Sequence, residues 1–283
     1  YEVISKEDWV GRRLVANRFR DRRVFIAGDA AHLWVPYAGY GMNAGIADAL
    51  NLAWLLAAQV QGWADPAMLD AYEAERQPIT EQVSRFAMDH AQKMIKARSA
   101  VPPNIEVDDA SGAAARALIG DEAYQLNVQQ FCCAGLNYGY YYSGSPIIAG
   151  DGEEPPPYTM GSFTASTVPG CRAPHFRLRD GRSLYDAFGP GYTLLVARPH
   201  ADAARLLQAA TDAGVPMTLL DLSAEPRRPT EYRHALLLCR PDQHVVWRGD
   251  ALPTDTAALV ELLRGAVPAV QAAARNEATA APA

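Results

Sequence analysis

The sequence predicts an α/β protein made of two folding units. Near the N-terminus, a short apolar run with β-branched residues is followed by a glycine-rich loop and a helical pattern. Nearer the C-terminus, strand, helix, strand, hairpin and helix patterns follow one another. A stretch rich in Pro and Gly separates the two. We therefore expect one unit over residues 1–100, a connecting segment over 101–165 and a second unit over 166–283.

The composition is that of a globular protein and excludes several classes. Lys and Arg total 26 against 32 Asp and Glu, a formal net charge of −6, which argues against a nucleic-acid surface. No apolar run approaches the roughly 20 residues that span a bilayer, and the first residues lack the apolar core of a secretory signal. None of the four cysteines forms a C-x-x-C pair. We expect a reduced, cytoplasmic protein with no membrane or nucleic-acid partner.

The first unit contains one candidate strand and two candidate helices. Residues 22–28, RRVFIAG, form a short apolar run that predicts a buried strand. Helical spacing of apolar residues predicts a helix over 43–60. Asp65 precedes a proline, which is the pattern of an N-cap followed by Pro at the first helical position. A second helix is expected over 67–100, with a kink or a restart at Pro78.

The second unit has the element order of a small α/β domain similar to thioredoxin. The expected elements are a short helix over 180–188, a strand over 191–197, a helix over 201–214, a strand over 215–222, two strands within 234–249 and a helix over 254–266. No C-x-x-C pair occurs within this unit, so a thioredoxin-type redox role is not expected. We expect Cys171 and Cys239 to be buried thiols instead.

An acidic residue stands where the first candidate strand ends. Asp29 follows Gly28 there, and ligands of α/β proteins bind at the carboxyl ends of strands. A carboxylate in this position can accept hydrogen bonds from two sugar hydroxyls, and Gly28 lets a ligand approach the backbone. The alternative is an ordinary strand-to-loop turn in which the glycines have no binding role.

The glycines beyond Asp29 lead into the start of the expected helix. Gly39, Gly41 and Gly45 relieve steric limits before and within its first turns. The backbone amides of Met42 and Asn43 would be unpaired donors at a helix N-terminus, which carries about half a positive charge. Such an end stabilises an anion, and a reduced flavin is one.

These residues resemble a known flavin-binding motif. Residues 24–56, VFIAGDAAH…P…GYGMNAGIADALNLAWLL, look like the second flavin-binding motif of the FAD-dependent aromatic (phenol-type) hydroxylases, the class A flavoprotein monooxygenases, and the likeness extends through YEAERQP at 72–78. Residues 169–198 and 236–249 resemble the thioredoxin-like C-terminal domain of the phenol hydroxylase branch. Tyr40 stands where Gln is common and Leu55 where Lys is common.

The resemblance implies a fold and a set of cofactor contacts. The fold would be the C-terminal part of a Rossmann-like FAD-binding domain followed by a thioredoxin-like α/β domain. Asp29 would hold the ribityl chain near the pyrophosphate, beside Gly28. Residues 39–43, including Gly39 and Gly41, would pass along the isoalloxazine ring, with the Met42 and Asn43 amides at its pyrimidine edge.

The resemblance also implies roles for the loop before the helix. Pro36, the residue assigned to catalysis, would present its carbonyl near the reacting edge of flavin and substrate. Trp34, Val35 and Tyr37 flank it and would line the substrate pocket, although anchoring of the loop explains them equally well. His32 is expected to be structural. The histidines show no spacing typical of metal ligands, so no metal is expected.

The family's first motif, G-x-G-x-x-G, is absent from the sequence, as is its middle motif. The resemblance therefore implies the C-terminal portion of an FAD-dependent monooxygenase that hydroxylates a phenolic aromatic with NADH or NADPH and O2. Its partners would be a missing N-terminal FAD-binding half and a second copy in a homodimer, and the isolated chain would be inactive. The alternatives are a polyketide or antibiotic hydroxylase of the same family and a non-catalytic assembly module.

Overall fold

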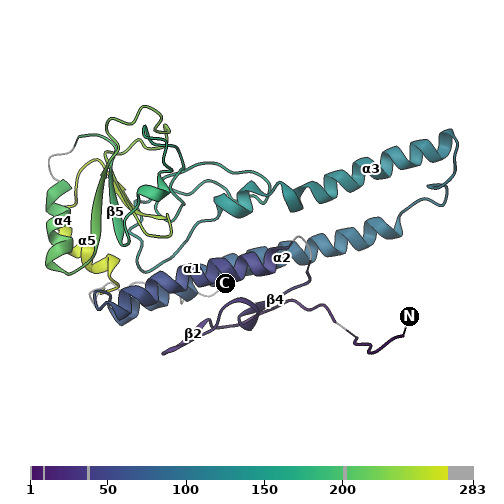
Figure 1. Cartoon of the computed structure of the whole chain (residues 1–283), viewed down its shortest axis with the longest axis horizontal. Helices are drawn as coiled ribbons and strands as arrows, with labels where there is room; N and C mark the ends of the chain where they lie inside the picture. Colours follow the sequence, from purple (N-terminus) through teal and green to yellow (C-terminus); the bar gives the residue numbers. More distant parts are fainter. Residues whose placement is uncertain (1, 9, 37–38, 200–202, 267–283) are drawn as a thin grey trace.

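The computed structural model describes residues 2–266 except for residues 9, 37–38 and 200–202. Two long helices, α1 (Tyr40–Val60) and α2 (Asp70–Ser99), pack side by side, and a four-stranded sheet with two helices lies at one end of this pair (Figure 1). The helix α3 (Ala110–Phe131) lies alongside the other end of α2. Within the described residues, no helix is both long enough and apolar enough to cross a membrane.

The helices of the first unit confirm the sequence prediction. The helix expected over 43–60 is α1, and the helix expected over 67–100 is α2, which follows a 3-10 turn (Pro66–Leu69). Asp65 caps that turn, because its carboxylate accepts a hydrogen bond from the amide of Ala67 at 2.9 Å. A restart at Pro78 is wrong, since α2 continues through that residue.

The strands of the first unit are short and form two antiparallel pairs. β1 (Leu14–Val15) pairs with β4 (His32–Leu33), and β2 (Arg20–Asp21) pairs with β3 (Val24–Phe25). The expected buried strand over 22–28 is therefore wrong: only two of its residues are in a strand, and Val24 is 66 % exposed. Among the described residues β2 is the only strand beside β3, so no wider sheet covers it.

The second unit has the order of strands and helices along the chain that its sequence predicts. β5 (Tyr192–Val196) and β6 (Met217–Asp221) are parallel and joined through α4 (Ala203–Asp212). β7 (Leu236–Cys239) lies antiparallel to β5 on its other side and forms a hairpin with β8 (Val245–Gly249). The helix α5 (Thr256–Leu263) follows, capped by Asp255. The helix expected over 180–188 is only a 3-10 turn, Tyr185–Ala187.

The connecting segment contains regular structure that its sequence did not predict. The helix α3 begins after Asp109, whose side chain accepts from the Gly112 amide at 2.8 Å. One π-helical turn, Gly135–Gly139, follows it. Gly112 is the one buried residue of α3. No row of apolar side chains along this helix is buried, and such a row is what helical periodicity in a sequence indicates.

A shared core and a buried ion pair join the two units. Trp54 and Trp63 pack edge-on against Tyr192 of β5, with ring centroids 6.2 and 6.1 Å away. Arg240, which follows β7, donates to both carboxylate oxygens of Glu75 on α2 at 2.5 and 2.9 Å. Both side chains are buried, so the position of the sheet is linked to that of α2.

Candidate functional site

The turn that carries Asp29 lies directly against the start of α1. Gly28 has a left-handed conformation with φ +55°, and a Cβ added at Gly45 would lie 3.3 Å from the Cα of Gly28. The 3.3 Å contact leaves little room for a side chain at Gly45, and the positive φ favours glycine at position 28. Two of the glycines singled out in the sequence therefore bring a loop and a helix to backbone contact.

A buried charged cluster fixes this contact from behind. The carboxylate of Asp48 on α1 accepts from the Gly28 amide at 3.2 Å, lies 2.6 Å from Nε2 of His32, and accepts from Nε of Arg76 on α2 at 2.9 Å. Burial by itself raises the pKa of Asp48, but the hydrogen bond with His32 and the charge of Arg76 outweigh it and hold the pKa below its ordinary value. Asp48 is thus a buried carboxylate that joins the turn, β4 and α2.

The N-terminus of α1 is open to solvent and has no side-chain cap. Its N-cap is Gly39, with φ 67°, and among the described residues no side chain bonds to the amides of the first turn. Gly39, Met42 and Asn43 are exposed and Gly41 is half-buried. The side chain of Asn43 donates to the Gly39 carbonyl at 2.9 Å. The donor set and its steric freedom fit the anionic edge of a flavin.

The remaining predicted site residues lie around this helix end. Asp29 is exposed in the 3-10 turn Gly28–Ala30, and Pro36 is exposed. Trp34 is half-buried and stacks on the ring of His32 with centroids 4.9 Å apart, and Val35 is buried. Tyr37 lies outside the described residues. His32 is buried against Asp48, which suits the structural role expected for it.

Exposed apolar side chains follow one side of α1 from this end. Met42, Ile46 and Leu50 recur at intervals of four residues along α1 and are 75 %, 58 % and 58 % exposed. Residues at this spacing share one side of a helix. Val24 and Leu14, on the short strands, are exposed as well. A row of exposed apolar residues along one helix side is typical of an interaction surface.

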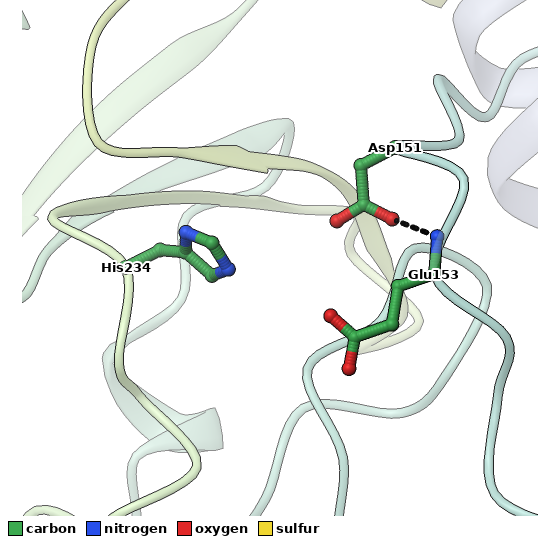
Figure 2. A group of neighbouring side chains, drawn as sticks. All are labelled: Asp151, Glu153 and His234. Atoms are coloured by element: carbon green, nitrogen blue, oxygen red, sulfur yellow. Dashed lines mark hydrogen bonds between the residues drawn. The ribbon is translucent and has the colours of Figure 1, made fainter.

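A second group of polar side chains, from the connecting segment and the second unit, belongs to an ion-pair network. Asp151, Glu153 and His234 place possible metal-ligand atoms within 4.8 Å of one another (Figure 2). However, Arg248 donates to Asp151 at 2.7 Å and to Glu153 at 2.5 Å, and Arg233 also pairs with Glu153. The arginines already neutralise both carboxylates, so this group carries no argument for a metal.

The cysteines show no feature of a redox site. All four, Cys132, Cys133, Cys171 and Cys239, are free. Burial raises the pKa of Cys171 to about 11 and that of Cys239 further still, so both thiols stay protonated at neutral pH. The expectation that these two thiols are buried is confirmed.

Comparison with known proteins finds a family match for each unit. Residues 1–87 match the family described as FAD binding domain, and residues 166–268 match the family described as aromatic-ring hydroxylase, C-terminal. The relatives of the chain are FAD-dependent monooxygenases, so the resemblance inferred from the sequence is confirmed and the cofactor is FAD.

Relatives and solved structures agree with this assignment. The chain is 33 % identical to aklavinone 12-hydroxylase RdmE of Streptomyces purpurascens, over 92 % of this chain and 46 % of that protein. It is 28 % identical to phenol 2-monooxygenase of a Pseudomonas species, over 93 % of this chain and 49 % of that protein. The rebeccamycin biosynthetic enzyme RebC with reduced flavin superposes with a TM-score of 0.83 at 35 % identity, over 94 % of this chain and 49 % of that one.

The chain spans about half the length of the curated relatives it matches. FAD-dependent monooxygenase opdD of Penicillium oxalicum, for example, is 34 % identical over 94 % of this chain, which corresponds to 52 % of that protein.

Sequence reasoning missed the cluster behind the site. Asp48 and Arg76 lie 28 residues apart on two helices, where charged residues ordinarily face solvent. The available signal was local: Asp48 sits within an otherwise apolar stretch of α1.

Proposed function

We propose that this chain supplies the part of an FAD-dependent monooxygenase that contacts the flavin ring, and that the enzyme hydroxylates a phenolic aromatic substrate with NADH or NADPH and O2. The observation that carries the proposal is the uncapped, exposed N-terminus of α1 held in backbone contact with the Gly28 turn. This arrangement offers hydrogen-bond donors and a positive dipole end beside a carboxylate, within a chain whose relatives are FAD-dependent monooxygenases.

Each predicted residue then has a defined task. The carboxylate of Asp29 binds ribityl hydroxyls, and the amides of Met42 and Asn43 bind the pyrimidine edge of the ring. Gly28, Gly39 and Gly41 leave room for the cofactor at the backbone, and the Pro36 carbonyl faces the reacting edge. When bound, FAD supplies the transfer of electrons from NAD(P)H to O2 and of one oxygen atom to the ring.

The loop between β4 and α1 is the proposed wall of the substrate pocket. Trp34 is fixed by its stacking on His32, and Val35 is buried. Together with Tyr37 these side chains would hold an aromatic ring and exclude water from the reacting edge.

The site is completed by a second polypeptide segment. We propose that the apolar face of Met42, Ile46 and Leu50 packs against the half that carries G-x-G-x-x-G, since this chain has no such motif for the ADP portion of FAD. We further propose a cytoplasmic homodimer; the four free thiols support the reducing compartment.

Polyketide hydroxylation is the second candidate, because identity to a putative polyketide hydroxylase of Streptomyces halstedii, 32 %, exceeds identity to the phenol 2-monooxygenase, 28 %. The two candidates differ in the size of the ring system. Oxidation of NAD(P)H stimulated by simple phenols but not by polycyclic phenols supports the first candidate, and the reverse result supports the second.

The test is reconstitution with the missing half. Residues 1–283 are co-expressed with the N-terminal segment of a relative, and the product is examined for flavin absorbance and for phenol-dependent NAD(P)H oxidation. In that enzyme Asp29→Ala should weaken FAD binding about tenfold or more, because hydrogen bonds to a charged group contribute about 1.5–3 kcal/mol. Asp121→Ala, an exposed carboxylate on α3, is the matched control. Absence of flavin from a folded complex would contradict the proposal.

A further inference from the structure

A cavity lies where the connecting segment meets the second unit. Its volume is about 540 Å³, within the range of small-molecule sites. The residues that line it are Tyr138, Phe163, Ala165, Arg172, Ala173, Pro174, His175, Tyr185, Pro229 and Glu231. None of them belongs to the proposed flavin site or to the Asp48 cluster, so this cavity is a separate candidate site.

Aromatic rings form much of its wall. Tyr138 and Phe163, from the connecting segment, have ring centroids 6.0 Å apart and are 50 % and 39 % exposed. On the side of the second unit, the ring centroid of Tyr185 lies 5.1 Å from that of His175. Aromatic side chains bind a flat ring through offset-stacked and edge-on contacts. The wall therefore indicates a ligand with an aromatic ring.

Arg172 contributes a positive charge between these two aromatic pairs. Its guanidinium carbon lies 5.6 Å from the Tyr138 ring and 5.1 Å from the Tyr185 ring. Its Nε donates to Oε1 of Gln243 at 2.8 Å, and its Nη2 donates to the same oxygen. Gln243 has a φ of 74°, which is uncommon for a residue other than glycine. A neutral amide and two rings thus orient the guanidinium, and no carboxylate of the described residues pairs with it.

Glu231 contributes a negative charge to the same cavity. It is half-buried, and its backbone carbonyl accepts from the Thr167 hydroxyl at 2.9 Å. Its carboxylate accepts no hydrogen bond and forms no ion pair within the part of the chain that the structure describes. Arg172 and Glu231 do not pair with each other, although both line the cavity. Two opposite and unpaired charges are complementary to a ligand that carries both an acidic and an ammonium group.

We propose that this cavity binds a small aromatic zwitterion of the aromatic amino acid class. The ligand carboxylate binds Arg172 and the ligand ammonium binds Glu231. The ligand ring packs against Tyr138, Phe163 and Tyr185. No flavin-site residue takes part, so the proposal stands independently of the proposed function.

The test is calorimetric titration of the full 283-residue chain, without flavin, using L-phenylalanine as the probe. Three comparison ligands each lack one feature: 3-phenylpropionate has no ammonium group, 2-phenylethylamine has no carboxylate, and L-alanine has no ring. We expect saturable one-to-one binding of L-phenylalanine at least tenfold tighter than that of each comparison ligand, and a rise in Tm at saturating L-phenylalanine. A comparison ligand that binds as tightly, or no saturable binding by a chain that is folded by circular dichroism, would overturn the proposal.

Two charge variants locate the ligand groups. Arg172→Gln should weaken the binding of L-phenylalanine about tenfold without weakening that of 2-phenylethylamine, which has no carboxylate to lose. Glu231→Gln should weaken L-phenylalanine by a similar factor without weakening 3-phenylpropionate. A general loss of structure would weaken all ligands alike, so the crossed pattern separates ligand contacts from folding.

The matched controls are Arg85→Gln, at a side chain that is 74 % exposed on α2, and Glu122→Gln, at an exposed position on α3. Both should bind L-phenylalanine as the unaltered chain does. Unchanged affinity in both cavity variants, or equal weakening of every ligand, would refute the assignment.

Discussion

The contact between the two units depends on one buried carboxylate, and its removal tests the architecture. Glu75 accepts from Arg240 through both oxygens, from Asn51 at 2.7 Å and from Ser145 at 2.6 Å. Arg240 is 0 % exposed and lies over the rings of Trp54 and Tyr142 at 4.9 and 5.0 Å. Glu75→Leu puts an apolar side chain of similar size in this position and removes one of the two carboxylates that pair with the Arg240 guanidinium.

The expected loss is large because the remaining charge stays buried. Breaking a buried ion pair by removing one partner costs about 3–5 kcal/mol. Arg240 keeps its pair with Asp242, with Nε to Oδ1 at 2.9 Å, so we expect the lower half of that range for Glu75→Leu. For a chain of this size, with about 2.1 cal/mol/K of unfolding entropy per residue, the corresponding fall in Tm is roughly 6 °C.

The assay is thermal and urea unfolding followed by circular dichroism. Glu75→Gln retains an acceptor oxygen and should lose less stability than Glu75→Leu, and Glu122→Gln, at an exposed site on α3, should lose almost none. Limited proteolysis should also cut the connecting segment over 101–165 faster in Glu75→Leu. If Glu75→Leu unfolds within 0.5 kcal/mol of the unaltered chain, the buried pair does not hold the units together.

Three further predictions follow from the same structure. Although burial by itself raises the pKa of Asp242, the charge of Arg240 holds that pKa below its ordinary value. As the pH falls, the unfolded chain therefore binds the proton first, so the stability that Asp242 contributes is fully present above about pH 5 and decreases as the pH drops through about 3.9, the pKa of an unfolded Asp. Urea unfolding measured at pH 3–7 will show this decrease. Asp242→Asn should flatten this dependence. Cys171→Ser with Cys239→Ser should lower Tm but leave flavin content and turnover of the reconstituted enzyme unchanged, and a large fall in turnover with normal flavin content would show a role for the thiols. The chain purified alone should hold no stoichiometric flavin, because losing about 4 kcal/mol of contacts to the ADP portion weakens binding roughly a thousandfold; an absorbance spectrum with a full flavin band would contradict this.

The sheet unit was predictable because its local signals agree with its tertiary structure. β5 and β7 are apolar runs bounded by Gly or Pro and are buried throughout, and the helix between β5 and β6 is strongly amphipathic. The helix α3 was missed because its sequence is rich in Ala and Gly and presents no apolar stripe. The strand prediction over 22–28 was wrong for another reason. An apolar run indicates burial, but burial also needs neighbouring strands, and in the described part of the chain β3 pairs only with β2.

The candidate site was predictable where backbone geometry limits the residue type. Gly28 and Gly39 stand at left-handed positions, which only glycine adopts without strain, so the sequence marked them. The burial of Arg76 and Thr80 was not predictable, because it arises from packing against α1 and residues 130–140. Such long-range contacts leave no pattern in the local sequence.

The position of Asp48 explains how a short turn and a helix end can form one side of a cofactor site. Its carboxylate binds the Gly28 amide, the His32 ring and the Arg76 guanidinium together, so the turn carrying Asp29, β4 and α2 are all fixed to α1 by one group. Because the cluster is buried, solvent does not screen these interactions. Asp48 therefore holds the Gly28 turn against α1 without a ligand, and such preorganisation would lower the cost of binding at the proposed cofactor site.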